Sequence, residues 1–463
     1  MSLHGPLGAT QSGAIELSRP GVDARAARSR ARTGLFALCG LMASGALATI
    51  SAAHTDTFLP ESVRPVPNWL AGPFAGAGVD LHVAGAVAVL VVMFASYVVA
   101  VGAADQLSGR AVLMCIAAFH AIVLLAPPLL STDIFSYQAY ARMGDLYGAN
   151  PYLNGPHAIA LDPVYPFIGA KWVTMPSVYG PAFTMLSYLL APMSIVASVF
   201  AYKSIAAVSS LVTVALVWNA ARLRGVDPVK AAAVVGLNPL LVVYGVGGGH
   251  NDILMLAALM AGVSLILQHR ERAGAGSLVL ATGIKLTAGL LLPFALAGAG
   301  NPLSRSRRRD IVIGAGVVGA LLAALTFAVF GLGPLRLPVT VFHSQSLGDW
   351  HSIPGFVSSR LGLGAVGHVT GDMLAAVFVA VTCWLLRRVW RGELDWLDAA
   401  GWATVAMLAT ASSLLPWYAA WLMPLAALAG DRRLLRSAIA MTGLVLFIQL
   451  LGYIPHGTTF LNL

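Results

Sequence analysis

Residues 80–104 read DLHVAGAVAVLVVMFASYVVAVGAA, and this run decides the fold class. A helix of about 20 apolar residues is long enough to cross the ~30 Å hydrocarbon core of a bilayer. Similar runs recur along almost the whole chain of 463 residues, which is 58% hydrophobic and only 10% charged. Soluble domains carry roughly 25% charged residues, so this chain has too few to cover a water-exposed surface. The sequence therefore predicts an all-α, polytopic membrane protein.

The apolar segments predict about 12 or 13 membrane-spanning helices. They occupy residues 35–53, 80–104, 111–130, 197–221, 228–246, 252–268, 276–298, 310–331, 370–390, 398–414, 417–430 and 434–452. The segment 276–298 has arginines near both of its ends, and two basic flanks favour the same side of the membrane. We therefore expect this segment to form a helical hairpin that turns near residues 283–287.

The distribution of charge predicts the orientation and the domains. The net charge of +9 arises from Lys and Arg clustered in short loops between apolar segments, as in cytoplasmic loops that follow the positive-inside rule. We expect a multi-pass protein of the inner (plasma) membrane with a cytoplasmic N-terminus, and no binding of nucleic acid. Residues 1–33 are expected to be a disordered cytoplasmic tail, and residues 34–463 a single membrane domain. Its two long outer loops span residues 131–196 and 331–370.

The sequence lacks the motifs of a protein that binds a soluble nucleotide. No glycine-rich phosphate-binding loop follows a strand, and the cytoplasmic loops are too short for a nucleotide-binding domain. Cys39, Cys115 and Cys383 lie within apolar segments and have no metal-ligand spacing. We predict no metal site and no resident cofactor, while the use of a divalent cation stays open. A lipid-linked donor reached from the outer face fits better than a soluble one.

The first candidate site, STDIFSY at residues 131–137, opens the longer outer loop. Asp133 and Tyr137 are four residues apart, so a helix would place both on one face. Asp133 either caps this helix or acts as a general base at the membrane surface. Arg142 and Tyr179 of the same loop are further candidates for substrate contacts.

The second candidate site is the sequence GGGHND at residues 247–252. His250, Asn251 and Asp252 begin an apolar helix directly after three glycines. They either cap this helix or bind a ligand, because glycines permit close approach and helix N-termini favour anions such as phosphate.

Two further candidates are a lysine inside the expected hairpin and a histidine in the second outer loop. Lys285 lies in an otherwise apolar segment, where a charge needs an anionic partner or a water path, and a phosphate is its natural ligand. His343 belongs to the polar stretch FHSQS at residues 342–346, followed by DWH at 349–351, and either binds substrate or is solvated. The aromatic stretch LPWY at residues 415–418, with Trp421, is read mostly as an anchor at the lipid interface.

Together these stretches resemble the membrane-embedded glycosyltransferases called GT-C. They resemble more closely the actinobacterial polyprenyl-phosphate-mannose-dependent α-(1→6)-mannosyltransferases. The resemblance is carried by STDIFSY (131–137), NPY (150–152), YGP (179–181), NPLL (238–241), HND (250–252), KL (285–286) and PWY (416–418). It covers residues from about 110 to 430, and the motifs are more specific together than apart.

The resemblance implies a GT-C-like fold and an inverting transfer from a β-linked polyprenyl phosphate sugar. Asp133 would take the proton from the acceptor hydroxyl. His250 and Lys285 match positions that could hold the donor phosphate, which needs cationic or hydrogen-bond-donating groups as it leaves. Asp252 matches an acid that some relatives replace by Glu. The chain is short beyond both ends of its membrane body, which leaves the acceptor in doubt.

The expected function is the transfer of a hexose, with mannose the first choice, from polyprenyl phosphate to a glycan or glycolipid acceptor on the outer face. A transporter or lipid-linked sugar flippase is the alternative. Many transporters contain repeats with helices broken in corresponding places. A second, symmetry-related broken helix would favour transport, but the sequence shows one clear break, near Lys285.

Overall fold

The computed structural model describes residues 20–65, 67–299, 305–346, 351–362 and 368–451. Helices account for 77% of the structure, and no strand occurs within these ranges. The prediction of an all-α polytopic membrane protein is therefore confirmed.

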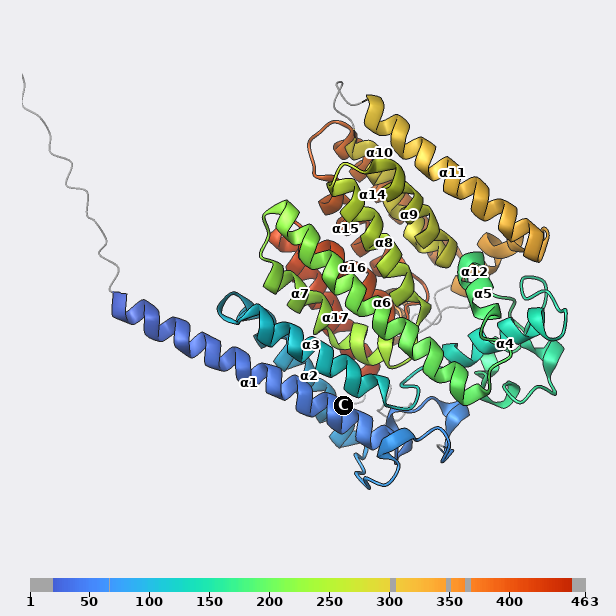
Figure 1. The fold of residues 1–463 in the computed structure, drawn as a ribbon, viewed down its shortest axis with the longest axis horizontal. Helices are drawn as coiled ribbons and strands as arrows, with labels where there is room; N and C mark the ends of the chain where they lie inside the picture. Colours follow the sequence, from blue (N-terminus) through green and yellow to red (C-terminus); the bar gives the residue numbers. More distant parts are fainter. Residues whose placement is uncertain (1–19, 66, 300–304, 347–350, 363–367, 452–463) are drawn as a thin grey trace, which may run out of the picture.

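Three N-terminal helices form one edge of the bundle (Figure 1). They are α1 (Pro20–Ala52), α2 (Val83–Gly102) and α3 (Gly109–Leu124). Because α1 begins at Pro20, residues 20–33 are helical and not part of a disordered tail; they are rich in Ala and Arg, which are good helix formers. The first nineteen positions of the expected tail lie outside the described residues.

The first outer segment is built from short helices. It contains α4 (Asp133–Asp145), several 3-10 turns and α5 (Pro181–Tyr188). Pro181 sits in the first turn of α5, where a missing N–H costs nothing. Figure 1 shows α4 and α5 together at the end of the bundle opposite the start of α1.

The centre of the bundle is a down–up–down arrangement of α6 (Ile195–Arg224), α7 (Pro228–Gly236) with η8 (Leu240–Val246), and α8 (Asn251–Leu267). α7 and η8 are bent by 45° at the break between them. η8 is a π-helix, a type of turn that occurs frequently at functional sites.

The segment 276–298 is a hairpin, as expected. α9 (Glu271–Ile284) ends at Lys285, whose backbone is extended, and the chain returns through η9 (Leu286–Leu290) and α10 (Leu291–Gly298). Ala275 near the start of α9 and Ala299 after α10 belong to one buried cluster. Both ends of the segment therefore lie on the same side. α11 (Arg305–Phe330) then runs parallel to α9.

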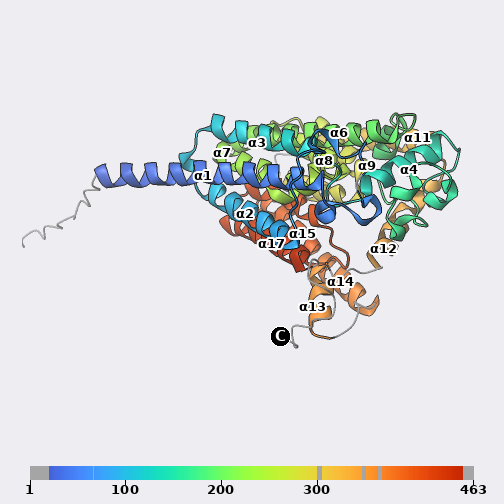
Figure 2. The same ribbon diagram turned by 90° about the horizontal axis from the view of Figure 1, so that it is seen from below.

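The C-terminal part covers the remaining face of the bundle. Its helices are α12 (Leu337–Ser346), α13 (Ile353–Arg360), α14 (His368–Trp390), α15 (Trp396–Thr410), η12 (Pro416–Trp421), α16 (Leu422–Leu428) and α17 (Arg432–Leu451). Figure 2 shows α12, α13 and α14 projecting on one side of the body. α14 exposes large apolar side chains such as Met373 and Trp384, as expected of a helix that faces lipid.

Fewer helices than expected are long enough to cross a membrane alone. By length and composition, six of the described helices qualify, or seven if the bent pair α7–η8 counts as one span. α3, α8 and the η9–α10 arm are apolar but shorter. Composition predicted about 12 or 13 crossings because it does not distinguish a full span from a short or broken helix.

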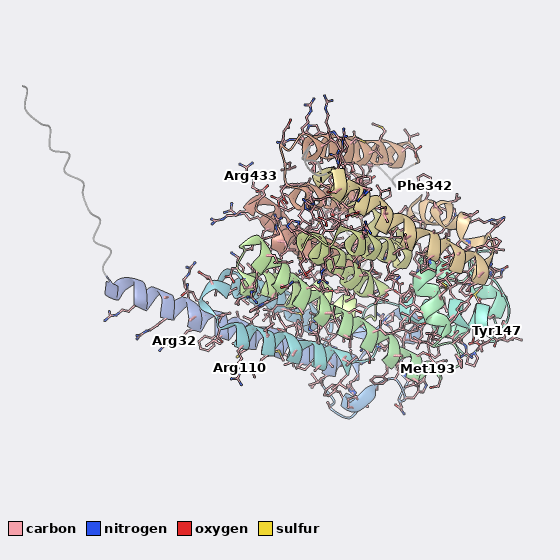
Figure 3. All side chains as sticks on the ribbon, turned by 45° about the horizontal axis from the view of Figure 1, so that its top comes forward. Arg32, Arg110, Tyr147, Met193, Phe342 and Arg433 are labelled. Carbon is pink, nitrogen blue, oxygen red and sulfur yellow. The ribbon has the colours of Figure 1, made fainter. Side chains whose placement is uncertain are left out.

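The two ends of the bundle differ in charge. Figure 3 labels Arg32, Arg110 and Arg433 toward one end, and Tyr147 and Phe342 toward the other. The loops at the basic end join α6 to α7, α8 to α9, and α10 to α11. This separation agrees with the loop charges on which the predicted orientation rests.

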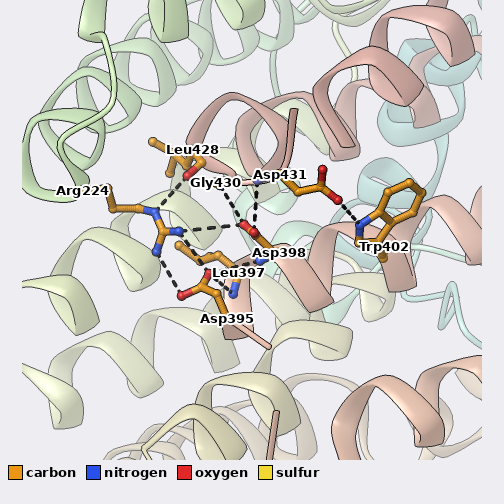
Figure 4. Close-up of polar contacts among 8 residues, drawn as sticks. All are labelled: Arg224, Asp395, Leu397, Asp398, Trp402, Leu428, Gly430 and Asp431. Carbon is orange, nitrogen blue, oxygen red and sulfur yellow. Dashed lines mark hydrogen bonds and ion pairs between the residues drawn. The ribbon is translucent and has the colours of Figure 1, made fainter. Parts of the chain in front are cut away.

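A clamp of polar contacts ties three helices together at the basic end (Figure 4). The guanidinium of Arg224 at the end of α6 donates to the carbonyl of Leu428, at 2.8 Å, and contacts Asp395, at 3.0 Å. The carboxylate of Asp398 accepts from the backbone N–H groups of Gly430 and Asp431. The clamp fixes α6, α15 and α16 at the end opposite the candidate site.

Candidate active site

Asp133 and His250 meet where α4 and α8 begin. Oδ2 of Asp133 lies 3.4 Å from Nδ1 of His250. The imidazole ring stacks on Trp417 from η12, with ring centroids 3.6 Å apart. Both residues are buried. The two candidate sites of the sequence, 131–137 and 247–252, therefore form one site.

Tyr137 lies on the same face of α4 as Asp133, as expected. Its hydroxyl donates to Oδ1 of Asn251, at 3.3 Å, and accepts from the Asn251 backbone N–H, at 3.2 Å. Burial, together with the nearby carboxylates of Asp133 and Asp252, raises the pKa of the Tyr137 phenol well above its usual range. Tyr137 therefore stays protonated and holds the start of α8 against α4.

Lys285 has an anionic partner, one of the two surroundings expected for a charged side chain in an apolar segment. Its ammonium lies 2.7 Å from Oδ1 of Asp252 and 4.5 Å from the centroid of the Tyr418 ring. Trp421 donates its indole N–H to the same carboxylate oxygen, at 2.7 Å. The second oxygen, Oδ2, has no hydrogen-bond partner among the described residues. Asp252 thus orients Lys285 from behind the pocket.

A cavity of about 300 Å³ opens onto Asp133 and Lys285. Its lining includes polar and aromatic side chains: Trp172, Tyr179, Ser344, Gln345, Asp372, Thr410, Ser412, Ser413, Tyr418 and Trp421. A second group of lining residues, mostly apolar, lies between α14 and α15: Ala375, Phe378, Met407 and Leu408. The cavity therefore combines a carboxylate, an ammonium group and a stretch of apolar wall, here called the apolar arm, on α14 and α15.

Glycines allow the backbone segments of the site to approach one another. Gly249 has a φ of +65°, and a Cβ there would lie 2.7 Å from Cδ1 of Ile134 on α4. A Cβ on Gly180 would lie 2.1 Å from the carbonyl oxygen of Gly283. The Gly180 N–H donates to the carbonyl of Ile284, at 3.0 Å, which joins the outer segment to the tip of the hairpin. Side chains at either glycine would separate these elements.

Comparison with known proteins assigns the family. A sequence model described as the α-(1→6)-mannopyranosyltransferase N-terminal domain matches residues 32–299, more than half of the chain. The chain belongs to this family. A second model, the MptB C-terminal domain, matches residues 348–462. Both parts of the site, from Asp133 to Lys285 and from Asp372 to Trp421, thus lie in matched regions.

Several family members of known name are similar over most of the chain. α-(1→6)-Mannopyranosyltransferase A of Mycobacterium tuberculosis is 28% identical over 375 residues, covering 73% of this chain and 69% of its own length. α-(1→6)-Mannopyranosyltransferase B of Corynebacterium glutamicum is 28% identical over 390 residues, covering 74% of this chain and 63% of its own. The resemblance to this family found in the sequence is confirmed.

Two predicted site residues of this family member lie elsewhere. Arg142 lies at the far end of α4, where its guanidinium contacts both carboxylate oxygens of Asp162 at 3.0 and 2.8 Å, and it does not line the cavity. Arginine pairs equally well with a carboxylate that only stabilises the fold. Nothing in the sequence indicated that Asp162 would be the partner of Arg142. His343 is exposed on α12, whereas its neighbours Phe342 and Ser344 line the cavity. Positions 349 and 350 of the same stretch lie outside the described residues.

The sequence did not predict the role of the aromatic cluster in η12. Trp417 and Trp421 are buried and contact His250 and Asp252, so they are not anchors at the lipid interface. Trp and Tyr near a helix end are typical of that interface, and their spacing carries no sign of a buried partner. The sequence signal for a role in the site was the resemblance of residues 416–418 to the PWY motif of the family.

Lys203 is fully buried, and the sequence analysis did not identify it as a candidate functional residue. Its ammonium donates to the carbonyls of Val123, at 3.0 Å, and Pro127, at 3.3 Å, and also to that of Ala126. Three donated bonds use all the hydrogens of an ammonium group. These carbonyls belong to the last turn of α3 and to the segment directly after it, which leads to Asp133. A lysine within an apolar run was the signal that could have found it.

We expect Lys203→Met to lower activity more than stability. The methionine removes the desolvation cost of a buried ammonium, which offsets the lost hydrogen bonds, so the free energy of unfolding changes by only about 1 kcal/mol. The segment before Asp133 loses its attachment, and misplacement of a reacting group lowers kcat by about 10- to 100-fold. Thermal unfolding and sugar-transfer kinetics measure the two effects, with Lys230→Met as the control. A variant that unfolds but keeps the kcat of its folded fraction would contradict this role.

Proposed function

We propose that the protein is an α-(1→6)-mannosyltransferase that moves mannose from a polyprenyl-phosphate-linked donor to a glycan or glycolipid acceptor. The single observation that carries this proposal is the presence of Asp133 and Lys285 in one cavity with an apolar arm. The family supports a mannosyl transfer of this linkage. The donor, the acceptor and the outer face are part of the proposal.

The chemistry assigned to the site is a single displacement. The acceptor hydroxyl gives its proton to the carboxylate of Asp133 while its oxygen forms a bond to the anomeric carbon. The bond between that carbon and the phosphate oxygen breaks, and its electron pair leaves with the polyprenyl phosphate. Lys285 stabilises the negative charge on the departing phosphate. Attack opposite to the leaving group converts a β-linked donor into an α-linked product.

The apolar arm of the cavity supports a lipid-linked donor. Phe378 on α14 and Met407 on α15 line this arm, and the outer surface of α14 is exposed and apolar. A prenyl chain could extend along this arm toward the bilayer while its phosphate reaches Lys285. A soluble nucleotide sugar has no long apolar group that could bind to these side chains. The location of the site at the end opposite the basic loops supports an outer-face reaction.

The alternative, a transporter or flippase, is not favoured. The structure has a second broken segment, α7–η8, in addition to the hairpin at Lys285. The hairpin carries Lys285 into the cavity, and η8 leads to His250, which contacts the cavity residue Asp133. Inverted repeats would instead place related breaks in two halves of the fold.

Transfer of radiolabelled mannose tests the proposal. Membranes that contain the protein receive polyprenyl-phosphate-mannose and a short α-mannoside, and the products are separated and cleaved with a linkage-specific mannosidase. We expect an α-(1→6)-extended product that is absent from membranes without the protein. Lack of transfer by well-expressed protein, combined with movement of the labelled lipid across sealed vesicles, would favour the flippase.

A further inference from the structure

Part of the cavity wall has no role in the chemistry above. Lys285, which Tyr418 and Asp252 hold in place, is assigned to the donor phosphate, and the apolar arm on α14 and α15 to the lipid. Several polar and aromatic lining residues remain: Trp172, Tyr179, Gln345, Asp372, Ser412 and Ser413. Because a general base must lie within hydrogen-bond reach of the proton it removes, the acceptor has to lie beside Asp133.

Trp172 stands next to the start of α4. It ends η7 (Ala170–Trp172) and donates its backbone N–H to the carbonyl of Gly169, at 2.8 Å. A Cβ on Gly169 would lie 3.0 Å from Oγ1 of Thr132 and 3.4 Å from Cδ1 of Trp172. The indole and the residue before Asp133 therefore flank the same glycine. Trp172 is thus a lining aromatic side chain that lies beside the segment leading to Asp133.

The wall formed by Tyr179 is rigid. The Tyr179 ring packs edge-on against Tyr137, with centroids 4.7 Å apart, and its backbone carbonyl accepts from the hydroxyl of Tyr152, at 3.0 Å. Burial raises the pKa of the Tyr179 phenol well above its usual range, so it stays neutral. This side of the cavity can therefore receive a ring without rearrangement.

Lining residues of α12 and α14 supply hydrogen-bonding groups. Oε1 of Gln345 on α12 accepts from the backbone N–H of Ser413, at 3.3 Å, which joins α12 to the end of α15. Asp372 lies in the first turns of α14 and is exposed. An ionised carboxylate only accepts hydrogen bonds, so its natural ligands are hydroxyl or N–H donors. A pyranose has hydroxyls on its edge and C–H groups on its faces.

We infer that Trp172, Asp372 and Gln345 form the subsite for the acceptor sugar. One face of the terminal hexopyranose packs on the Trp172 indole, and its edge hydroxyls donate to Asp372 and bond with Gln345. Its free primary hydroxyl then points at Asp133. The orientation of the bound sugar toward Asp133 rests on the proposed function. The binding of a neutral pyranoside by these three side chains does not, and is expected whether or not transfer follows.

Binding without the donor tests the subsite. The full-length protein in lipid nanodiscs is titrated with an α-(1→6)-linked mannobioside, and saturation-transfer NMR measures the dissociation constant. We expect Trp172→Ala and Asp372→Asn to weaken binding by about tenfold, and Trp172→Phe to keep most of it. Trp69→Ala is the matched control, because Trp69 is an exposed tryptophan of the preceding outer segment that does not line the cavity.

The outcomes separate the subsite from the proposed function. Equal binding by wild type, Trp172→Ala and Asp372→Asn would overturn the subsite, as would a wild type that binds no mannoside. Asp372→Asn keeps the shape of the side chain and guards against a Trp172→Ala variant that fails to fold, which thermal unfolding detects. Transfer is measured on the same samples. Wild-type protein that binds the disaccharide selectively but transfers nothing would overturn the proposed function and leave the subsite standing.

Discussion

Asp133→Asn is expected to lower kcat for mannosyl transfer on the order of 10²- to 10⁴-fold, the range that general-base catalysis contributes. The amide keeps the size and hydrogen-bonding shape of the carboxylate but cannot take a proton from the acceptor hydroxyl. His250 stays stacked on Trp417, so the start of α8 is not disturbed. The measurement is transfer at saturating donor and acceptor, with the amount of folded protein determined for each variant.

Asp145→Asn is the matched control for this change. Asp145 ends the same helix, α4, but is exposed and does not line the cavity. We expect it to keep wild-type kcat. The Michaelis constants should change little in Asp133→Asn, because the base acts mainly in the transition state. An Asp133→Asn variant with near-wild-type kcat would remove Asp133 from the mechanism.

Lys285→Met is expected to lower kcat by about 10²- to 10³-fold, the loss that follows removal of a group that stabilises developing charge. The same change leaves the buried carboxylate of Asp252 without its cation, which costs about 3–5 kcal/mol of stability. Lost activity alone would therefore be ambiguous. Donor saturation kinetics and thermal unfolding have to be measured together.

The double variant Lys285→Met/Asp252→Asn separates the two effects. The neutral amide can still accept the indole N–H of Trp421, which the carboxylate accepts at 2.7 Å in the wild type. We expect the double variant to recover most of the stability while its kcat stays low. If activity returned together with stability, Lys285 would act only by neutralising Asp252, and the donor phosphate would need another partner.

Physical reasoning from the sequence reached the fold class and part of the site. Periodicity placed Asp133 and Tyr137 on one face of α4, and both contact the first residues of α8. The cost of a charge among apolar residues predicted a partner for Lys285, and the basic flanks of 276–298 predicted the hairpin. Each of these predictions depends on neighbours in sequence or on a local free-energy cost.

The remainder of the site depends on contacts that no local pattern encodes. Asp252 is 33 positions from Lys285, and Trp421 is 169 positions from Asp252. Arg142 and Lys285 are both cations next to polar motifs, and only the tertiary structure shows that one holds a loop and the other lines the cavity. Fewer of the described helices are long enough to span a membrane alone than the sequence predicted, since apolarity does not report where a helix ends.

The hairpin also sets how far Lys285 lies from the basic end of the bundle. Glu271 starts α9 at the basic end, where its carboxylate lies 2.6 Å from Nε of Arg307. The 14 residues of α9 extend about 21 Å along the helix axis, which is less than the ~30 Å thickness of a hydrocarbon core. If the donor is a lipid-linked sugar, as proposed, such a short arm would require its phosphate to lie below the plane of the neighbouring head groups. We therefore expect the rate of the proposed transfer to depend on the thickness of the membrane and hence on its lipid composition.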